Sequence, residues 1–423
     1  MTIRRQVWVA FTAALFIRLV YVGWYPQVAN LCPDCEVYDR VAKNLASGMG
    51  LVGGTSGDTS FGQIPNAGSA PEVGVGPIYP VFLQGVYWVA GHRLGAVRIV
   101  QAVLGALIVP LIWQIGSQAF GSSAGQLCGW LVACSPPLIA YSGLVLTENL
   151  SVMLLVLSAW LLITAIARRA VWRFVVSGAS LGVLILLREE MVVLLPALAL
   201  IAAWQGRPRP GWPHLVAYVM TAVFVVGAYS VRNYLVVGKP LLVTAHGGET
   251  LWISAKGWTE WHFDDPELHR LTQGLSYVER NEVLQHDALR TIAADPGHYL
   301  RLCVGRVPVL WVSSHTTYMH GLSERYTVYL GRANYTVLAV KVALLAFHVA
   351  MLMLAIGGLW LGWRMPTRSL ELWVMTAPIA AITLVHFFLF SAPRYQIPVL
   401  PFVLAFAALP VSRGLGLESG RTS

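Results

Sequence analysis

The chain has 423 residues, of which 56% are hydrophobic and only 12% charged, about half the charged share of a soluble protein. A soluble domain cannot bury so much apolar surface, so the composition excludes soluble, disordered and disulfide-rich secreted proteins and predicts a membrane protein. The formal charge of +9 would suit nucleic acid, but in a membrane protein it more often reflects basic cytoplasmic loops and contacts with headgroups or phosphates.

Apolar runs predict an all-α polytopic fold, because a helix crosses a bilayer with about 20 apolar residues. Arg188, Glu189 and Glu190 interrupt the run 171–204, so we expect a turn at the membrane surface there. About ten transmembrane helices follow from this pattern, at 7–25, 96–118, 123–143, 146–167, 171–187, 190–205, 212–231, 336–363, 369–390 and 396–412.

Arginines in the short loops fall on one side if the N-terminus is cytoplasmic and the run 78–91 does not cross. That run carries Tyr79, Tyr87 and Trp88, which are typical of an interfacial helix. The predicted organisation is a first span (1–25), a first outer loop with interfacial helices (26–95), spans two to seven (96–231), a second, mixed but mainly helical outer segment (232–335), spans eight to ten (336–412) and a cytoplasmic tail (413–423).

Two carboxylates are candidates for catalysis on the predicted outer side. Asp34 follows the first span and opens a helical repeat that Gly48 ends, and Glu148 begins the fourth span. A helix N-cap would explain Asp34, and the helix dipole would explain Glu148. Ionisable groups at membrane depth are costly and tend to be functional, so the pair could instead supply a general base and a partner or metal ligand.

Three arginines lie at the outer ends of predicted spans, namely Arg188, Arg232 and Arg394. Each could simply reach toward lipid headgroups. If several converge on one pocket, they would bind a phosphate or pyrophosphate.

Cys32 and Cys35 form a CxxC pair that the predicted topology places in an oxidising compartment. We expect a disulfide rather than a redox site, because no thioredoxin-like βαβ pattern surrounds the pair. Two sulfurs are a weak signal for zinc, since no second pair lies nearby. Of the remaining cysteines, Cys128 and Cys134 are interpreted as packing residues and Cys303 as a free thiol.

Five short motifs follow one another along most of the chain: Asp34 with Tyr38, Ala42, Leu45 and Gly48; Tyr79-Pro80 followed by Gln101; Ser135-Pro136 with Leu146-Thr147-Glu148; Arg232-Asn233-Tyr234 with Gly247-Gly248; and Arg394-Tyr395 with Pro398 and Pro401. In this order and spacing they resemble the bacterial C-type glycosyltransferases that use polyprenyl-phosphate sugars. These include relatives of the protein O-mannosyltransferases and of the lipid A aminoarabinose transferase.

The resemblance implies inverting transfer of a sugar from a polyprenyl-phosphate donor to an acceptor hydroxyl, at the outer face of the cytoplasmic (inner) membrane. Asp34 would be the base and Glu148 a second catalytic acid. Substrate contacts would come from Arg188, Arg232, Arg394, Tyr38 and Tyr395. The implied partners are the lipid-linked donor, a glycan, lipid or protein acceptor and membrane lipid, with no nucleic acid. No cofactor is certain, and a divalent cation is the candidate.

Two other classes stay open on the sequence alone. A transporter or flippase for a lipid-linked or anionic solute would place charges near the middle of the membrane, as Lys341, His348 and His386 suggest. However, no inverted repeat is visible. The second alternative is a non-catalytic assembly protein on the same fold.

Overall fold

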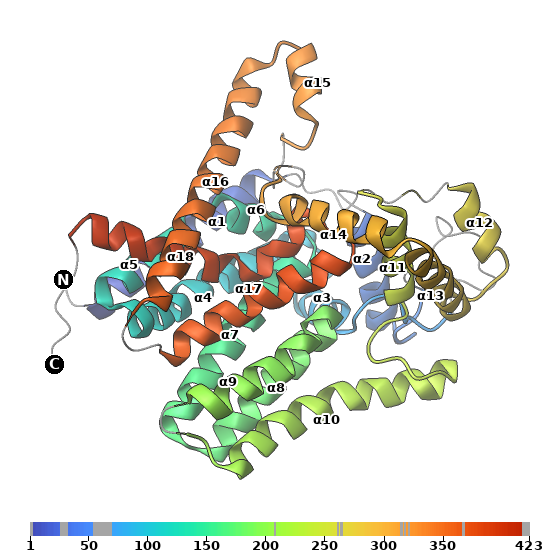
Figure 1. The fold of residues 1–423 in the computed structure, drawn as a ribbon, viewed down its shortest axis with the longest axis horizontal. Helices are drawn as coiled ribbons and strands as arrows, with labels where there is room; N and C mark the ends of the chain where they lie inside the picture. Colours follow the sequence, from blue (N-terminus) through green and yellow to red (C-terminus); the bar gives the residue numbers. More distant parts are fainter. Residues whose placement is uncertain are drawn as a thin grey trace.

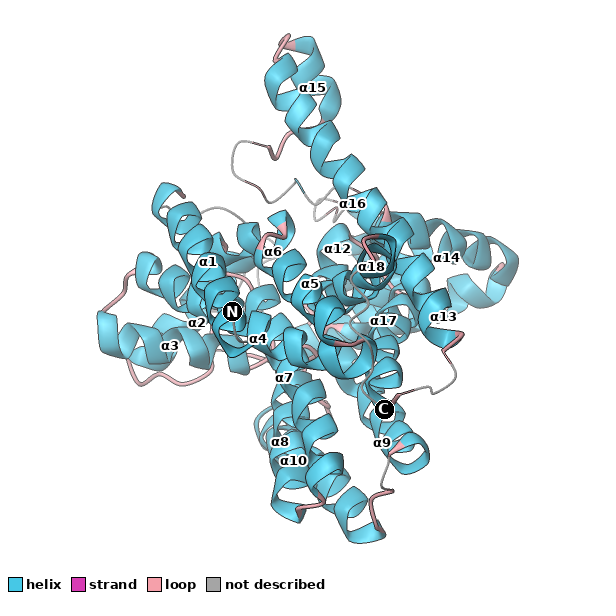
Figure 2. Ribbon diagram, turned by 90° about the vertical axis from the view of Figure 1, so that its left-hand side faces the viewer, coloured by secondary structure: helices cyan, strands magenta, loops and turns pink. Residues whose placement is uncertain are grey.

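The structure is a computed structural model that describes residues 3–25, 33–53, 70–206, 209–259, 262, 265–313, 316, 319, 322–365 and 369–416. Over these residues the chain is helical, apart from an isolated bridge between Val52 and Pro71 (Figure 2). The all-α prediction is therefore confirmed. The helices are α1 (Ile3–Trp24), α2 (Pro33–Ala46), α3 (Ile78–Ala90), α4 (Leu94–Phe120), α5 (Ser122–Ala133), α6 (Pro136–Ala140), η4 (Tyr141–Gly143), α7 (Thr147–Arg168), α8 (Val171–Leu187), η5 (Glu189–Val193), α9 (Leu194–Gln205), α10 (Trp212–Val237), α11 (Gly247–Lys256), α12 (Pro266–Thr272), α13 (Tyr277–Ala294), α14 (Pro296–Trp311), α15 (Tyr326–Gly331), α16 (Tyr335–Trp363), α17 (Leu370–Phe388), η7 (Pro393–Val399) and α18 (Leu400–Gly414).

Seven of the predicted spans contain a helix that is long and apolar enough to cross a membrane, among the described residues. They are α1, α4, α7, α10, α16, α17 and the continuous unit of η7 and α18. α8 has 17 residues, at the lower limit of about 17 residues for a span. The 13 residues of α3 are too few to cross, which agrees with an interfacial helix.

The expected single span 123–143 is divided into α5 and α6. Pro136 and Pro137 cannot donate main-chain hydrogen bonds, and Ser135 before them is extended, with φ −65° and ψ 115°. Arg18 of α1 is fully buried and donates to the carbonyls of Ala133 and Val132 at 3.1 and 3.2 Å, which satisfies the free C-terminal end of α5.

The span expected at 190–205 is also shorter. Residues Glu189–Val193 form the 3₁₀ turn η5, and α9 has only 12 residues, about 18 Å of helix. The charged triplet that begins at Arg188 does break the chain as predicted, because Arg188 is extended (φ −143°) between α8 and η5.

Small residues let the helices approach closely. A side chain at Gly178 of α8 would strike the Tyr218 carbonyl of α10, and one at Gly182 would contact Val225 at 2.8 Å. These two glycines, four residues apart, therefore serve helix packing.

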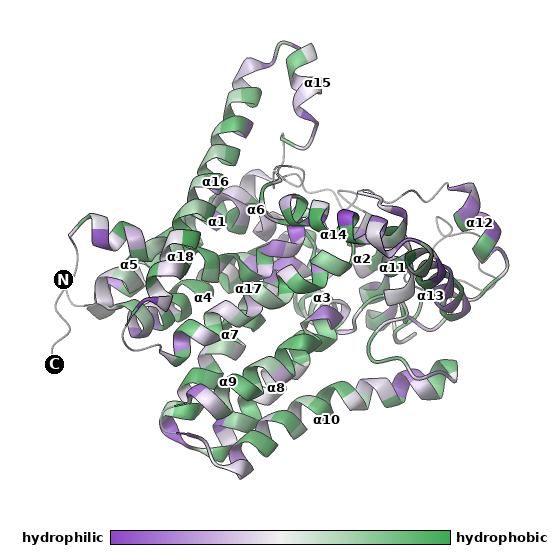
Figure 3. Cartoon of the chain, in the orientation of Figure 1, coloured by the Kyte–Doolittle hydropathy of each residue, from purple (hydrophilic) through white to green (hydrophobic). Residues whose placement is uncertain are grey.

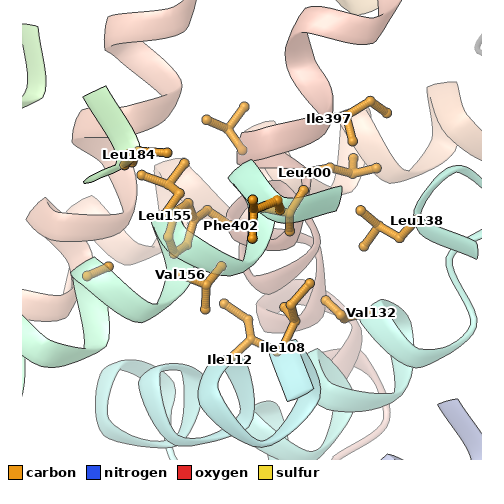
Figure 4. Close-up of a cluster of buried hydrophobic side chains, with 14 of the residues drawn as sticks. Ile108, Ile112, Val132, Leu138, Leu155, Val156, Leu184, Ile397, Leu400 and Phe402 are labelled. Carbon is orange, nitrogen blue, oxygen red and sulfur yellow. The ribbon is translucent and has the colours of Figure 1, made fainter. Parts of the chain in front are cut away.

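The core lies between α4, α5, α7, α8 and α18, where Ile108, Val132, Leu155, Leu184 and Phe402 converge (Figure 4). The η7–α18 unit is the most enclosed span, with 83% of its apolar window buried, against 17% for α10 and for α16. Figure 1 shows α10 along one edge and α16 projecting from the opposite side. Both helices are mostly apolar in Figure 3, and their large exposed side chains, such as Phe224 of α10 and Met353 of α16, suit contact with lipid.

Several of the more polar helices, α2 and α11–α14, lie toward one end of the molecule in Figures 1 and 3. Ser276 and Glu279 form a capping box that starts α13, and Asp295 caps α14. Over its described residues, the segment 232–335 is thus mainly helical, as predicted. This end contains the candidate site.

Candidate active site

Helix α2 brings Asp34 to the site. Its apolar side packs through Val37, Val41 and Ala42, which are buried, and Gly48 ends the repeat with φ +82°. The helix begins at Pro33, so Asp34 lies in its first turn, where an acid is favoured by the dipole. Its carboxylate is 46% exposed and is turned to a distant segment of the chain.

Arg394 of η7 binds Asp34 with its Nη1 at 2.6 Å from Oδ2. The same guanidinium lies near Glu148, with Nε 3.9 Å from Oε1. Asp34 and Glu148, which the sequence proposed as a functional pair, are therefore joined by one arginine. The arrangement unites residues that lie 360 positions apart in sequence.

Glu148 and Arg188 meet because α7 and α8 are consecutive helices that pack together, so that the start of α7 and the end of α8 lie at the same end. Arg188 Nη1 is 3.6 Å from Glu148 Oε1, and Arg188 Nε is 2.6 Å from Glu190 Oε1 of η5. Glu148 is 2% exposed and Arg188 8%. Two arginines, Arg188 at the end of α8 and Arg394 of η7, thus lie near the same buried oxygen of Glu148.

The ring of Tyr395 supports both arginines. The guanidinium carbon atoms of Arg188 and Arg394 lie 5.5 and 5.3 Å from its centroid, within the range of about 6 Å for a cation–π contact. His386 of α17 stacks on the same ring at 4.4 Å between centroids. Tyr395 is therefore placed to fix the two guanidinium groups.

Tyr38, one helical turn after Asp34, belongs to a second polar network beside the acids. Its ring meets Tyr79 of α3 at 5.0 Å, and Tyr79 donates to Gln101 of α4 at 2.7 Å. Gln101 donates in turn to the carbonyls of Ser142 and Leu144, at 3.2 and 2.6 Å, in the segment that leads into α7. The predicted pair Tyr79 and Gln101 thus positions the chain just before Glu148.

The charges around Asp34 set its protonation. The surrounding protein excludes part of the water, which by itself would raise the pKa of the carboxyl. The ion pair and hydrogen bond with Arg394, with smaller effects of His246 and Arg188, outweigh this and hold the pKa of Asp34 below its ordinary value of 3.8. Asp34 is therefore ionised at neutral pH. Burial, followed by the charges of Asp34 and Glu148, raises the pKa of Tyr38, which stays neutral.

Arg232 lies outside this group. Its guanidinium donates to the carbonyls of Glu72 and Leu51, at 2.9 and 3.2 Å, and to the side chain of Asn233 at 3.0 Å. Those contacts tie α10 to the first outer segment. The structure thus brings together Arg188 and Arg394 of the three predicted arginines, and gives Arg232 structural contacts.

Two participants in the group were not predicted for it. The sequence predicts a turn at Glu190 and offers His386 only as support for a transporter. The sequence signal for Glu190 was its position, two residues after Arg188 and across a break between helices. Nothing in the sequence indicated that His386 would stack on Tyr395, since that contact depends on how α17 meets η7.

Cys35 is buried and disulfide-bonded, whereas Cys128, Cys134 and Cys303 are free. Cys32 lies outside the described residues, so its pairing with Cys35 stays a prediction. A disulfide at Cys35 stands one residue from Asp34, at the start of α2.

The residues of the site do not match a divalent-metal centre. No three of the described His, Cys, Asp and Glu side chains group as metal ligands. Moreover, an ion held by Asp34 and Glu148 would lie against the guanidinium groups that already face both carboxylates.

Residues 74–229 match the sequence model of the family described as dolichyl-phosphate-mannose-protein mannosyltransferase. That segment carries Glu148 and Arg188. The resemblance to polyprenyl-phosphate-dependent glycosyltransferases is confirmed for this part of the chain. No curated protein matches the sequence.

The fold is similar to that of the Archaeoglobus fulgidus oligosaccharyltransferase. The apo form gives a TM-score of 0.56 at 13% identity over 98% of this chain and 51% of that one. The form tethered with an acceptor peptide gives 0.55 at 12% identity, over 98% and 50%. ArnT from Cupriavidus metallidurans bound to undecaprenyl phosphate gives 0.41 at 16% identity, over 96% and 78%. The chain thus spans about half the length of the archaeal enzyme and shares its membrane fold.

Proposed function

We propose that this protein is a membrane glycosyltransferase that moves a sugar from a polyprenyl-phosphate donor to an acceptor hydroxyl on a glycan, lipid or protein. The reaction takes place at the outer face of the cytoplasmic membrane and inverts the configuration at the sugar C1.

One observation carries the proposal. A partly exposed, ionised carboxylate, Asp34, lies beside two arginines that share a buried acid and an aromatic ring. A proton acceptor therefore lies next to two guanidinium groups. Glycosyl transfer from a lipid phosphate needs both, because a hydroxyl loses a proton while negative charge develops on the departing phosphate.

In the proposed reaction the acceptor oxygen attacks the sugar C1 from the face opposite the phosphate. The C1–O bond to the phosphate breaks and its electron pair stays on the phosphate, which leaves as polyprenyl phosphate. Asp34 takes the proton of the acceptor hydroxyl. Arg188 and Arg394 offset the charge on the leaving group, with Glu148 and Tyr395 positioning them.

A small, mostly apolar pocket beside η7 supports the choice of a lipid donor. It is lined by Pro136 and Pro137 of α6, by α16 around Leu344 and Met351, and by Leu400 of α18. Leu400 directly follows η7, which carries Arg394. We propose that the prenyl chain enters here from the bilayer, with the phosphate directed toward η7.

The residues that would favour a transporter have local partners instead. Lys341 donates to the carbonyls of Leu322 and Glu324, both at 2.7 Å. The rings of His348 and His386 each form a 2.8 Å hydrogen bond with a main-chain carbonyl. These contacts explain the three ionisable side chains as structural, so we do not propose transport.

The test is transfer by purified protein in lipid, supplied with labelled polyprenyl-phosphate sugars and a panel of acceptors. Asp34→Asn should lower turnover by ~10²–10⁴-fold. Glu36→Gln is the matched control, because Glu36 is an exposed acid on the same helix. Equal loss in both variants, or near-normal turnover in Asp34→Asn, would contradict the role of Asp34.

A further inference from the structure

Arg394 is bound to the Asp34 carboxylate, which must be free to accept a proton in the proposed reaction. Its 2.6 Å contact with Asp34 uses one of the two carboxylate oxygens. A base works best when its pKa lies near the working pH, yet this pair keeps Asp34 a weak base. The described arrangement therefore suits the protein before substrate binds better than the moment of proton transfer.

The two arginines are held differently. Arg188 is buried and lies 2.6 Å from Glu190, whose side chain is 22% exposed, and 3.6 Å from the buried Glu148. Arg394 is 17% exposed, and its short contact is with a carboxylate that is itself 46% exposed. Its distance to the buried Glu148 is 3.9 Å. An incoming anion can compete for Arg394 more easily than for Arg188.

The main chain at Arg394 is fixed while its side chain reaches outward. Two residues further on, the Gln396 side chain is buried and donates to the Leu310 carbonyl of α14. Tyr395 is stacked on His386. A change of partner by Arg394 therefore needs only rotation of its side chain over the Tyr395 ring.

We propose that the phosphate of the donor takes the place of Asp34 on the guanidinium of Arg394. The base is then released only when the donor is bound. This inference rests on the proposed function and adds an order to it, with donor before acceptor. Arg394 leaves the Asp34 carboxylate, forms a paired hydrogen bond with the phosphate, and stays near Glu148 and Tyr395. A carboxylate is thus exchanged for a phosphate, both of which fit the planar guanidinium.

The exchange should change how Asp34 titrates. The charged and titratable groups that face it are Arg394 of η7, Arg188 after α8, His246 before α11, Glu148 of α7 and Tyr38 of α2. Loss of the Arg394 contact, together with the nearby phosphate charge, should raise the titration midpoint of Asp34 by roughly one to two pH units. The other four groups stay in place.

The direct test is infrared titration of the Asp34 carboxyl in bilayers, taken as the difference between wild type and Asp34→Asn. The probe is a polyprenyl phosphate without sugar, which carries the phosphate but permits no transfer. Its binding should move the midpoint upward. Saturable binding with an unchanged midpoint would overturn the exchange and leave the proposed function standing.

Kinetics gives a second test. The acid side of the pH profile of kcat/KM for the donor reports the titration of Asp34 in the free enzyme, and the acid side of the kcat profile reports it in the donor complex. The acid limb of the kcat profile should therefore lie at higher pH. In Arg394→Gln the two limbs should coincide, whereas in Arg332→Gln, an exposed arginine paired with Glu324, they should stay apart. Coincident limbs in wild type would refute the exchange. Absence of transfer with every lipid-linked donor would instead refute the proposed function.

Discussion

Asp34 and Asp39 share helix α2 but have opposite surroundings. Asp39 is 6% exposed and accepts hydrogen bonds from Tyr87 at 2.6 Å and from His92 and Lys43 at 2.8 Å each. Asp34 is 46% exposed and is held by Arg394. Asp39, with three donors from its own helix and from the chain around α3, therefore holds α2 in place. Asp34, half-exposed beside arginines, is accessible to a substrate.

We expect Asp39→Asn to destabilise the protein by ~1–3 kcal/mol, because three donors lose their charged acceptor. Burial alone would raise the pKa of Asp39, but hydrogen bonds from Lys43, Tyr87 and His92 lower it below 3.8. This stabilisation is therefore present above pH 3.8 and is lost as the pH falls through the lower folded value.

Thermal unfolding in detergent at neutral and acid pH measures both effects. The wild type should lose stability at acid pH, and the gap to Asp39→Asn should narrow there. Glu36→Gln should behave like wild type. A constant gap at all pH values would contradict the electrostatic account of Asp39.

Lysine substitutions should separate the two kinds of arginine. Arg394→Lys keeps the charge but loses the planar fork, so we expect kcat/KM for the donor to fall about 10–100-fold. Arg232→Lys should leave donor kinetics unchanged and lower the melting temperature, because Arg232 joins α10 to the carbonyls of Leu51 and Glu72. A larger kinetic defect in Arg232→Lys than in Arg394→Lys would reverse the assignment.

At the scale of elements, helix ends rather than helix middles build the site. The start of α7, the end of α8, the turn η5 and the proline-containing η7 each contribute a side chain from a place where regular helix stops. Main-chain direction changes at these positions, so side chains from four segments can point to one place. The helices behind them are apolar and rigid, which fixes the distances.

Two neighbouring glycines of α16 give a matched test of helix packing. A Cβ at Gly358 would collide with the Phe406 carbonyl of α18, whereas one at Gly357 would meet nothing within 4 Å. Gly358→Ala should therefore lower the melting temperature by forcing α16 away from α18. Gly357→Ala should be neutral or stabilising by up to ~1 kcal/mol, since alanine favours a helix. Equal effects of the two substitutions would rule out the close α16–α18 contact.

At the scale of the molecule, the candidate site lies at one end. Figure 1 shows the start of α1 and the end of α18 at the left, and α2 with α11–α14 at the right. Short-loop arginines predict that the first of these ends is cytoplasmic. Cysteine labelling in intact cells should then report the loop at Arg209 as inside and Ser276, the N-cap of α13, as outside. Labelling of both positions from one side would refute the predicted topology.

The sequence by itself determined that the protein lies in a lipid bilayer, that its fold is all-α and where most of its helices lie. Composition required lipid, and apolar runs marked α1, α4, α7, α10, α16, α17 and the last span, because hydropathy and length act locally along the chain. It also indicated the break at Arg188 and the helix opened by Asp34. The division of 123–143 was within reach of the same reasoning, since Pro136 and Pro137 stand in the run.

Only the tertiary structure decided which polar residues form the site. Arg232 and Arg394 looked alike in sequence, each at the outer end of a span, yet one holds a loop and the other binds Asp34. Glu190 and His386 join the group, and Asp39 is excluded from it, through contacts between segments up to hundreds of residues apart. Such contacts depend on how whole helices pack, and ion pairs are decided by a few ångströms, a precision that local sequence patterns do not carry.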